Sequence, residues 1–205
     1  MFIKNNCKMI LNKINFFMNK NFFNVMFIFK IPVKKDFKKK EKIFIINNHN
    51  ELEKIPAKID NVLKNKIKAR LSKECTAYLY IEQGVIKGYL FSHHPKVKDI
   101  WHDFLPTNHF DARLFDIYVQ PAYRGCEIAP MLQQEFVNDM YKRGVLFLWS
   151  AVNHRNYNSI NCHRKVNSQI IQKNFLIKIF GRNIISIVWP TLKINILIGK
   201  RRNKL

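Results

Sequence analysis

The fold is decided by the stretch Tyr118-Val119-Gln120-Pro121-Ala122-Tyr123-Arg124-Gly125-Cys126-Glu127-Ile128-Ala129. Residues 113–120 read as a buried strand, which ends at Pro121 because proline cannot donate a ladder hydrogen bond. From Ile128 to Arg143 apolar residues recur at helical spacing, which predicts an amphipathic helix. Free backbone N–H groups where such a helix begins form a ready site for phosphate. A loop with one glycine is also an ordinary connection, so this pattern alone is a weak signal.

Outward from this stretch, the chain alternates between strand and helix patterns. An apolar run at residues 43–46 predicts a strand, and Asn50 with Glu53 predicts a capping box that opens a helix over 51–72. The other expected strands are residues 76–81, 85–91, 145–152 and two segments within 170–189, and a further short helix is expected over 156–166. This order predicts an α/β fold with a mixed, mostly antiparallel sheet flanked by helices.

Length and composition fit one globular domain. The 205 residues are 47% hydrophobic, which is enough for one sizeable core. We expect that domain at 42–190, a flexible basic leader at 1–41 and a basic C-terminal tail at 191–205. The leader has the charge balance of a targeting peptide, but it lacks Arg up to residue 35. An upstream start codon or a loosely attached leader is the preferred interpretation, and peripheral contact of leader or tail with a membrane stays an alternative.

The net charge of +22 suggests a polyanionic partner. However, the charge is mostly lysine spread along the chain, without a recognition motif, so no nucleic-acid partner is expected. The four cysteines form no C-x-x-C pair, which favours a reducing cytoplasm. No apolar segment is long enough to cross a membrane. The histidines of the loop at 96–110 match no familiar zinc spacing, so no metal is expected.

Two motifs carry a family resemblance. The run Val119-x-Pro121-x-Tyr123-Arg124-Gly125-x-x-Ile128-Ala129 resembles the acetyl-CoA motif V-x-P-x-Y-R-G-x-G-I-G/A of the GNAT acetyltransferases. At the expected distance, Asn156-x-x-Ser159-Ile160-x-x-His163-x-Lys165 is similar to the later motif N-x-x-[AS]-x-x-x-[YH]-x-K-x-G-F of that family. Two matches in the right order are more specific than either one, and they imply a single-domain GNAT-like fold.

The resemblance also implies roles for individual residues. The backbone of Ile117, Tyr118 and Val119 would bind the pantetheine arm of acetyl-CoA, and Asn156 would lie near its thiol. His163 would be the general acid that protonates the thiolate, with a helix-face histidine packed on the sheet as the alternative. Asp116 is nominated as the base. The pyrophosphate would bind the main chain of the loop and the helix start, namely Arg124, Gly125, Cys126, Glu127, Ile128 and Ala129.

The implied function is transfer of an acetyl group from acetyl-CoA to a primary amine. The acceptor is a small molecule or a peptide, and an amino sugar is one candidate. Two departures from the motifs favour an alternative function. In this alternative, the chain keeps the GNAT fold but has lost catalysis, and it is an acyl-CoA-binding or regulatory protein. Glu127 stands where the family usually has Gly, and Asn167-Ser168 replace the usual Gly-Phe.

Overall fold

A computed structural model describes residues 23–32, 42–71, 73, 75–93, 111–145, 147–179, 182–189 and 193–196. The chain divides into two compact units. The first unit comprises Met1–Ile28, Val152–Asn156 and Ile170–Leu205, and the second comprises Phe29–Ala151 and Tyr157–Gln169. All of the expected site residues except Asn156 belong to the second unit.

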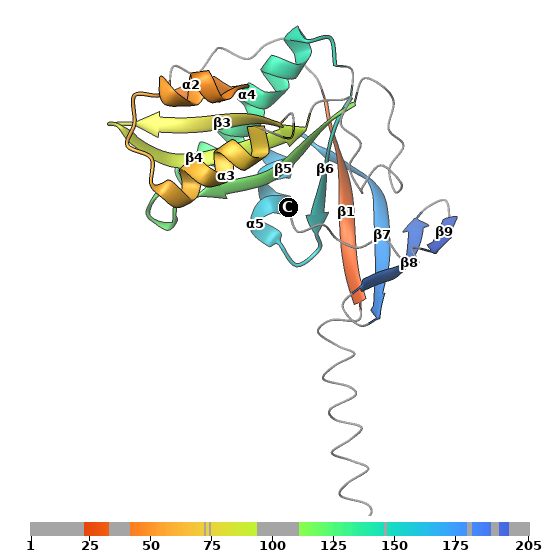
Figure 1. The fold of residues 1–205 in the computed structure, drawn as a ribbon. Coiled ribbons are helices and arrows are strands. Elements are labelled where there is room, and N and C mark those ends of the chain that lie inside the picture. The colour runs from red at the N-terminus through yellow and green to blue at the C-terminus, as the bar shows by residue number, and fades with distance from the viewer. Residues whose placement is uncertain are drawn as a thin grey trace, which may run out of the picture. The chain divides into compact units, whose positions relative to one another are not determined.

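The second unit is built on a sheet whose strands follow the order β2-β3-β4-β5-β6 (Figure 1). Neighbouring strands are antiparallel from β2 to β5, whereas β5 and β6 are parallel. The strands are β2 (Ile43–Ile46), β3 (Cys75–Glu82), β4 (Val85–His93), β5 (Asp111–Val119) and β6 (Phe147–Asn153), of which the last two residues belong to the first unit. The expected mixed, mostly antiparallel sheet is confirmed.

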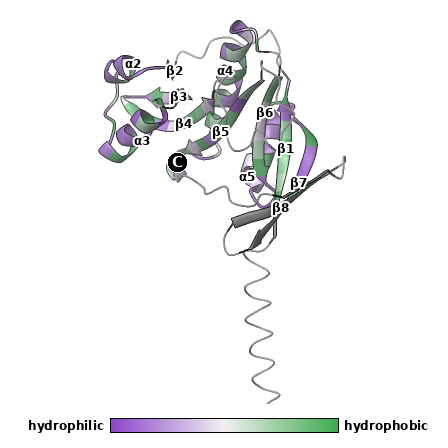
Figure 2. Cartoon of the chain, turned by 45° about the vertical axis from the view of Figure 1, so that its right-hand side comes forward, coloured by the Kyte–Doolittle hydropathy of each residue, from purple (hydrophilic) through white to green (hydrophobic). Residues whose placement is uncertain are grey.

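Helices cover both faces of this sheet (Figure 1). Helix α3 (Asn61–Leu71) packs through Ile67 and Leu71 onto the face that carries Leu79 and Phe91. Helix α4 (Ile128–Lys142) packs through Leu132 and Phe136 onto the opposite face. Figure 2 shows the matching division of α4 into hydrophobic and hydrophilic residues. Burying these apolar faces is the main source of stability for the unit.

The helix predicted over 51–72 is two helices, and this prediction is therefore wrong. The first turn is α2 (His49–Glu53), and residues 54–60 are irregular before α3 begins. Its cap is Asn48, whose side chain accepts from the Glu51 amide at 3.0 Å, so the capping box lies two residues before the expected one. Pro56 belongs to the irregular segment, since proline removes a helical donor and clashes with the preceding turn.

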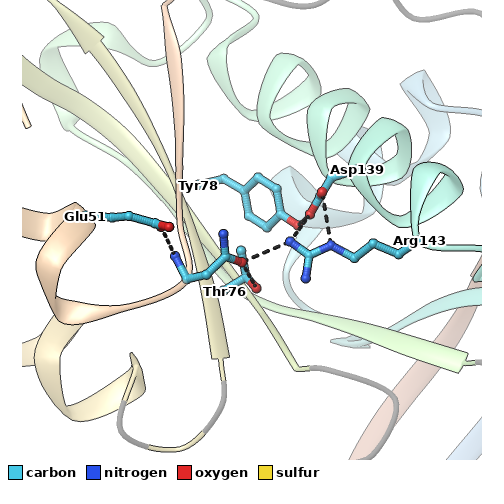
Figure 3. Close-up of polar contacts among 6 residues, drawn as sticks. Glu51, Thr76, Tyr78, Asp139 and Arg143 are labelled. Atoms are coloured by element: carbon cyan, nitrogen blue, oxygen red, sulfur yellow. Dashed lines mark hydrogen bonds and ion pairs between the residues drawn. The ribbon is translucent and has the colours of Figure 1, made fainter.

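A polar network joins α2, the sheet and α4 (Figure 3). The Tyr78 hydroxyl donates to Asp139 at 2.6 Å, and Arg143 pairs with the same carboxylate at 2.9 Å. Arg143 also donates to the Asn47 side chain at 2.9 Å. Because Tyr78 is fully buried, its hydrogen bond with a charged group fixes the C-terminal half of α4 against β3.

The first unit contains strands on both sides of the expected domain boundaries. They are β1 (Phe23–Ile31), whose last three residues belong to the second unit, β7 (Gln169–Ile179), β8 (Arg182–Trp189) and β9 (Lys193–Ile196). The β7–β8 and β8–β9 pairs are antiparallel. Part of the expected leader thus forms β1, where Ile28 is fully buried, and part of the expected tail forms β9; the domain boundaries stay a prediction. Residues 1–22, 33–41 and 197–205 lie outside the described residues.

Apolar residues occupy every second position within β1 and β9, although both ends of the chain are rich in lysine.

The hairpin predicted at residues 82–84 is confirmed. Gln83 and Gly84 both have positive φ, as the favoured two-residue turn between antiparallel strands requires. Helix α4 ends as expected at Gly144, which has a φ of 72°. Among the described helices, none combines the length and the apolar character that crossing a membrane demands.

Candidate functional site

The junction between β5 and α4 presents unpaired backbone donors. After β5 the chain forms a 3₁₀ turn at Pro121–Tyr123, and α4 begins at Ile128. Within the turn, the Arg124 amide donates to Pro121 at 3.3 Å and the Cys126 amide to Tyr123 at 3.4 Å. Among the described residues, no acceptor outside the helix is bonded to the amides of Gly125, Glu127, Ile128 and Ala129. These four N–H groups lie at the positive end of the α4 dipole, which favours a phosphate.

Two left-handed residues shape this turn. Gly125 has a φ of 86° and Glu127 a φ of 58°. A Cβ on Gly125 would meet no atom within 4 Å, so the backbone angle, and not crowding, is the reason for glycine there. Glu127 adopts the same region with a side chain, which costs on the order of 1–2 kcal/mol. The motif position that usually holds glycine is therefore strained in this chain.

The side chain of Glu127 has a partner on the second motif. Its carboxylate forms an ion pair with Lys165, in the last turn of α5 (Tyr157–Lys165). Both side chains are about half exposed, at 54% and 53%. The charge that would repel a phosphate is thus partly neutralised from the neighbouring helix. The sequence alone left the direction of this carboxylate open.

A β-bulge interrupts β5 next to the junction. Phe91 pairs with Phe115 and Tyr89 with Tyr118, so Leu90 faces two residues, Asp116 and Ile117. Asp116 has a φ of 54°, and it is the extra residue of the bulge. The side chains of Phe115 and Asp116 consequently lie on the same face as α3, while Ile117 packs with the core on the α4 side.

On its other side, β5 loses its partner strand. The parallel pairing with β6 runs from Asp111–Phe147 to Leu114–Ser150 and stops there. The edge of Phe115–Val119 toward β6 is therefore not paired by a described strand. Extended backbone with a free edge can take up an extended ligand by strand-like hydrogen bonds. The Val119 carbonyl accepts from the Arg124 side chain at 3.3 Å, which connects this edge to the turn.

Asp116, the nominated base, is held by cations of α3. Its carboxylate lies 3.0 Å from the Lys66 ammonium and 3.7 Å from the Arg70 guanidinium. Sequence reasoning did not connect either cation with Asp116. A sequence pattern could have indicated these two cations. Lys66 and Arg70 are four residues apart in α3, and each directly precedes a buried apolar residue, Ile67 or Leu71, so both lie near the side of the helix that faces the sheet.

His163, the nominated general acid, is buried with an exposure of 1%. Its Nε2 lies 2.8 Å from the Ser150 hydroxyl and its Nδ1 3.3 Å from the Gln133 amide, and its ring stacks on Phe29 with centroids 4.6 Å apart. Burial lowers the pKa of His163 to about 4, so the ring is neutral at pH 7. Its role as an acid stays a prediction, and the observed contacts are those of a packed structural residue.

Two further residues of the second motif are placed as follows. Cys162 donates to Gln133 at 3.3 Å, and burial raises the pKa of its thiol to about 12, so it is not an activated nucleophile. Asn156 directly precedes α5 and belongs to the first unit, and its contact with the thiol end of the cofactor stays a prediction. No group of three metal-ligating side chains occurs within the described part of the chain, and the histidine-rich loop at 96–110 lies outside it.

Comparison with solved structures relates the fold to acetyltransferases. A putative GNAT acetyltransferase of Novosphingobium aromaticivorans aligns over 74% of this chain and 61% of its own, with 10% identity and a TM-score of 0.55. A GNAT acetyltransferase of Colwellia psychrerythraea aligns over 76% and 57%, with 13% identity and a TM-score of 0.51. A protein of unknown function from Staphylococcus epidermidis aligns over 79% and 64%, with 7% identity and a TM-score of 0.51.

The chain thus spans less than two thirds of the length of each of these three structures. No curated protein sequence matches it. A family model described as the acetyltransferase (GNAT) family matches residues 46–167, a range that includes the β5–α4 junction and both motif runs, 119–129 and 156–165. On this match, together with the fold and the order of its motifs, the chain belongs to the GNAT acetyltransferase family.

Proposed function

We propose that the chain is an N-acyltransferase that moves an acetyl group from acetyl-CoA to a primary amine. The observation that carries the proposal is the set of four free amides in the turn and at the start of α4, next to a β5 edge that β6 leaves unpaired. A diphosphate fits the first feature and an extended pantetheine arm fits the second. Gly125, Glu127, Ile128 and Ala129 hold the pyrophosphate through their N–H groups, and Ile117–Val119 bind the arm.

The reaction follows from this placement. A neutral amine attacks the thioester carbonyl, the C–N bond forms, and the C–S bond breaks with release of the CoA thiolate. Backbone N–H groups near the bulge stabilise the negative charge on the carbonyl oxygen. Asp116 receives the amine proton directly or through water. A thiol has an ordinary pKa near 8.5, so the thiolate takes its proton from water without a buried acid such as His163.

A thermal-shift titration of the full chain tests the binding step. Acetyl-CoA at about 100 times its dissociation constant stabilises a folded protein by about 2.7 kcal/mol, which raises the Tm of a chain of this size by several degrees. CoA release in the presence of primary amines, including amino sugars and peptides, tests the transfer step. The absence of a shift with acetyl-CoA, CoA and longer acyl-CoAs would contradict the proposal.

The second candidate function is binding of acyl-CoA without transfer. It is favoured by the strained Glu127 at a position where the motif usually has glycine, and by the burial of His163. Under this alternative, acetyl-CoA raises the Tm but no amine is acetylated. Slow release of CoA with one amine and not with others would distinguish a selective enzyme from such a binding protein.

A further inference from the structure

A cluster of cations and aromatic rings lies on the face of β4 and β5 that α3 covers. We call it the α3 cluster, and it comprises Lys66, Arg70, Tyr89, Phe91, Phe115 and Asp116. The Lys66 ammonium lies 2.6 Å from the Tyr89 hydroxyl and 4.7 Å from the centre of its ring. The Arg70 guanidinium lies 5.0 Å from the centre of the Phe115 ring. The aromatic rings hold both cations over the sheet rather than out in solvent.

The two cations are partly withdrawn from water and share one carboxylate. Their side chains are 35% and 16% exposed, and Asp116 is the described carboxylate that pairs with both. Burial opposes the charge of Lys66, but its hydrogen bonds with Tyr89 and Asp116 keep its pKa above the ordinary value. Two positive charges therefore meet one negative charge in a setting where electrostatic interactions are stronger than in bulk water.

A third cation borders the cluster from the sheet. The Arg113 guanidinium lies 5.7 Å from the centre of the Phe115 ring. Burial, and after it the charge of Arg70, lower the pKa of Arg113 to about 9. The two guanidinium groups of Arg70 and Arg113 repel each other. An anion bound near Phe115 would attract both groups and so offset this repulsion.

The α3 cluster lies next to the backbone that is proposed to bind acetyl-CoA, so it is placed to contact the acceptor. Asp116 is the bulge residue, and it directly precedes Ile117–Val119, the backbone proposed to bind the pantetheine arm. The amine must reach the thioester carbonyl at bonding distance. An acceptor in that position therefore has its amine near Asp116 and the neighbouring part of its structure near Lys66 and Arg70.

Resting on the proposed transfer function, we propose that the acceptor is an amine that also carries an anionic group, a carboxylate or a phosphate, and that Lys66 and Arg70 bind this anion. Binding displaces part of the pairing between these cations and Asp116. The released carboxylate then faces the acceptor amine. The same contact thus recognises the anion and frees the nominated base.

Matched amine pairs test the proposal in the full chain with acetyl-CoA. One pair is an α-amino acid and its amide, and the other is glucosamine 6-phosphate and glucosamine, so that the two arms separate carboxylate from phosphate. We expect kcat/KM to be at least about tenfold higher for the charged member of one pair, the effect of one charge-assisted contact. In Arg70→Gln and Lys66→Gln that ratio falls toward one, mainly through KM for the charged member.

The control is Lys64→Gln, which removes the same charge from α3 at a side chain that pairs with Glu53 at 2.8 Å. It leaves the ratio unchanged, whereas Lys66→Arg restores it in part. Acetyl-CoA binding by each variant, measured by thermal shift, shows that the variant is folded and separates failure of this inference from failure of the proposed function. Equal responses to charged and neutral members of both pairs, including no response to either, overturn the inference.

Discussion

Replacing Glu127 by glycine separates the strain and the charge at the phosphate-binding turn. The left-handed backbone of Glu127 costs on the order of 1–2 kcal/mol, which glycine avoids. The change also removes a half-exposed ion pair with Lys165, worth about 0–1 kcal/mol, and a carboxylate near the helix start, worth about 0.3–1 kcal/mol. These opposing terms nearly cancel, so the free energy of unfolding changes by only about 1 kcal/mol in either direction.

The effect of this change on acetyl-CoA binding has a definite sign. A carboxylate about 5 Å from a phosphate charge repels it by about 3 kcal/mol at an effective dielectric constant of about 20. Lys165 and the 54% exposure of Glu127 reduce this repulsion, so about 1 kcal/mol is the reasonable remainder. We expect Glu127→Gly to tighten CoA binding by about fivefold, measured by isothermal titration calorimetry at low salt.

Glu127→Gln is the matched variant, because it removes the charge and keeps the strained backbone. It tightens CoA binding as well, but its Tm is lower than that of Glu127→Gly, because the strained backbone is kept. Acetyl-pantetheine, which lacks the diphosphate, binds all three forms equally. The reasoning is refuted if Glu127→Gly weakens CoA binding, or if acetyl-pantetheine responds as strongly as CoA.

Three further changes have expected outcomes. In Gly88→Ala the new Cβ meets Ile128 Cγ2 at 2.9 Å and the Tyr118 carbonyl at 3.0 Å, so we expect a loss of about 1–3 kcal/mol by urea unfolding, together with weaker CoA binding. Tyr78→Phe removes the 2.6 Å bond to Asp139 and should cost about 2 kcal/mol while CoA affinity is kept; a change in affinity without a change in stability would contradict this. The lowered pKa of His163 means that the unfolded chain binds a proton below about pH 6.5 and the native chain only near pH 4, so stability falls as the pH drops through this window. His163→Gln should flatten that part of the stability profile, and an unchanged slope would refute the assignment.

The sequence predicted the parts of the fold that depend on local pattern. The helix at Ile128–Lys142, the turn at Gln83-Gly84 and the stop at Gly144 were all visible, because period, turn chemistry and backbone handedness are properties of neighbouring residues. The break at Pro56 was underestimated, since a continued apolar period masked the irregular segment. The strands β1 and β9 were missed because lysine-rich composition dominated the interpretation of both ends.

Only the part of the candidate site that consists of backbone amides could be predicted from the sequence. The motif located the free amides of the turn, but it did not show that Lys165 meets Glu127 or that Lys66 and Arg70 meet Asp116, because these contacts join residues far apart in the sequence. A packed His163 was one of the two interpretations of the sequence, but its partners Phe29, Ser150 and Gln133 could not be named before the fold was known. Long-range contacts of this kind require the folded chain.

The bulge in β5 determines the effect of deleting one residue, Asp116. Leu114, Ile117 and Val119 face one core while Phe115 and Tyr118 face the other, and this alternation is intact if Asp116 is skipped. Excision of that single residue therefore leaves every apolar side chain on its proper side and closes the ladder with β4. The side-chain alternation of β5 thus does not require Asp116, the residue proposed as the base.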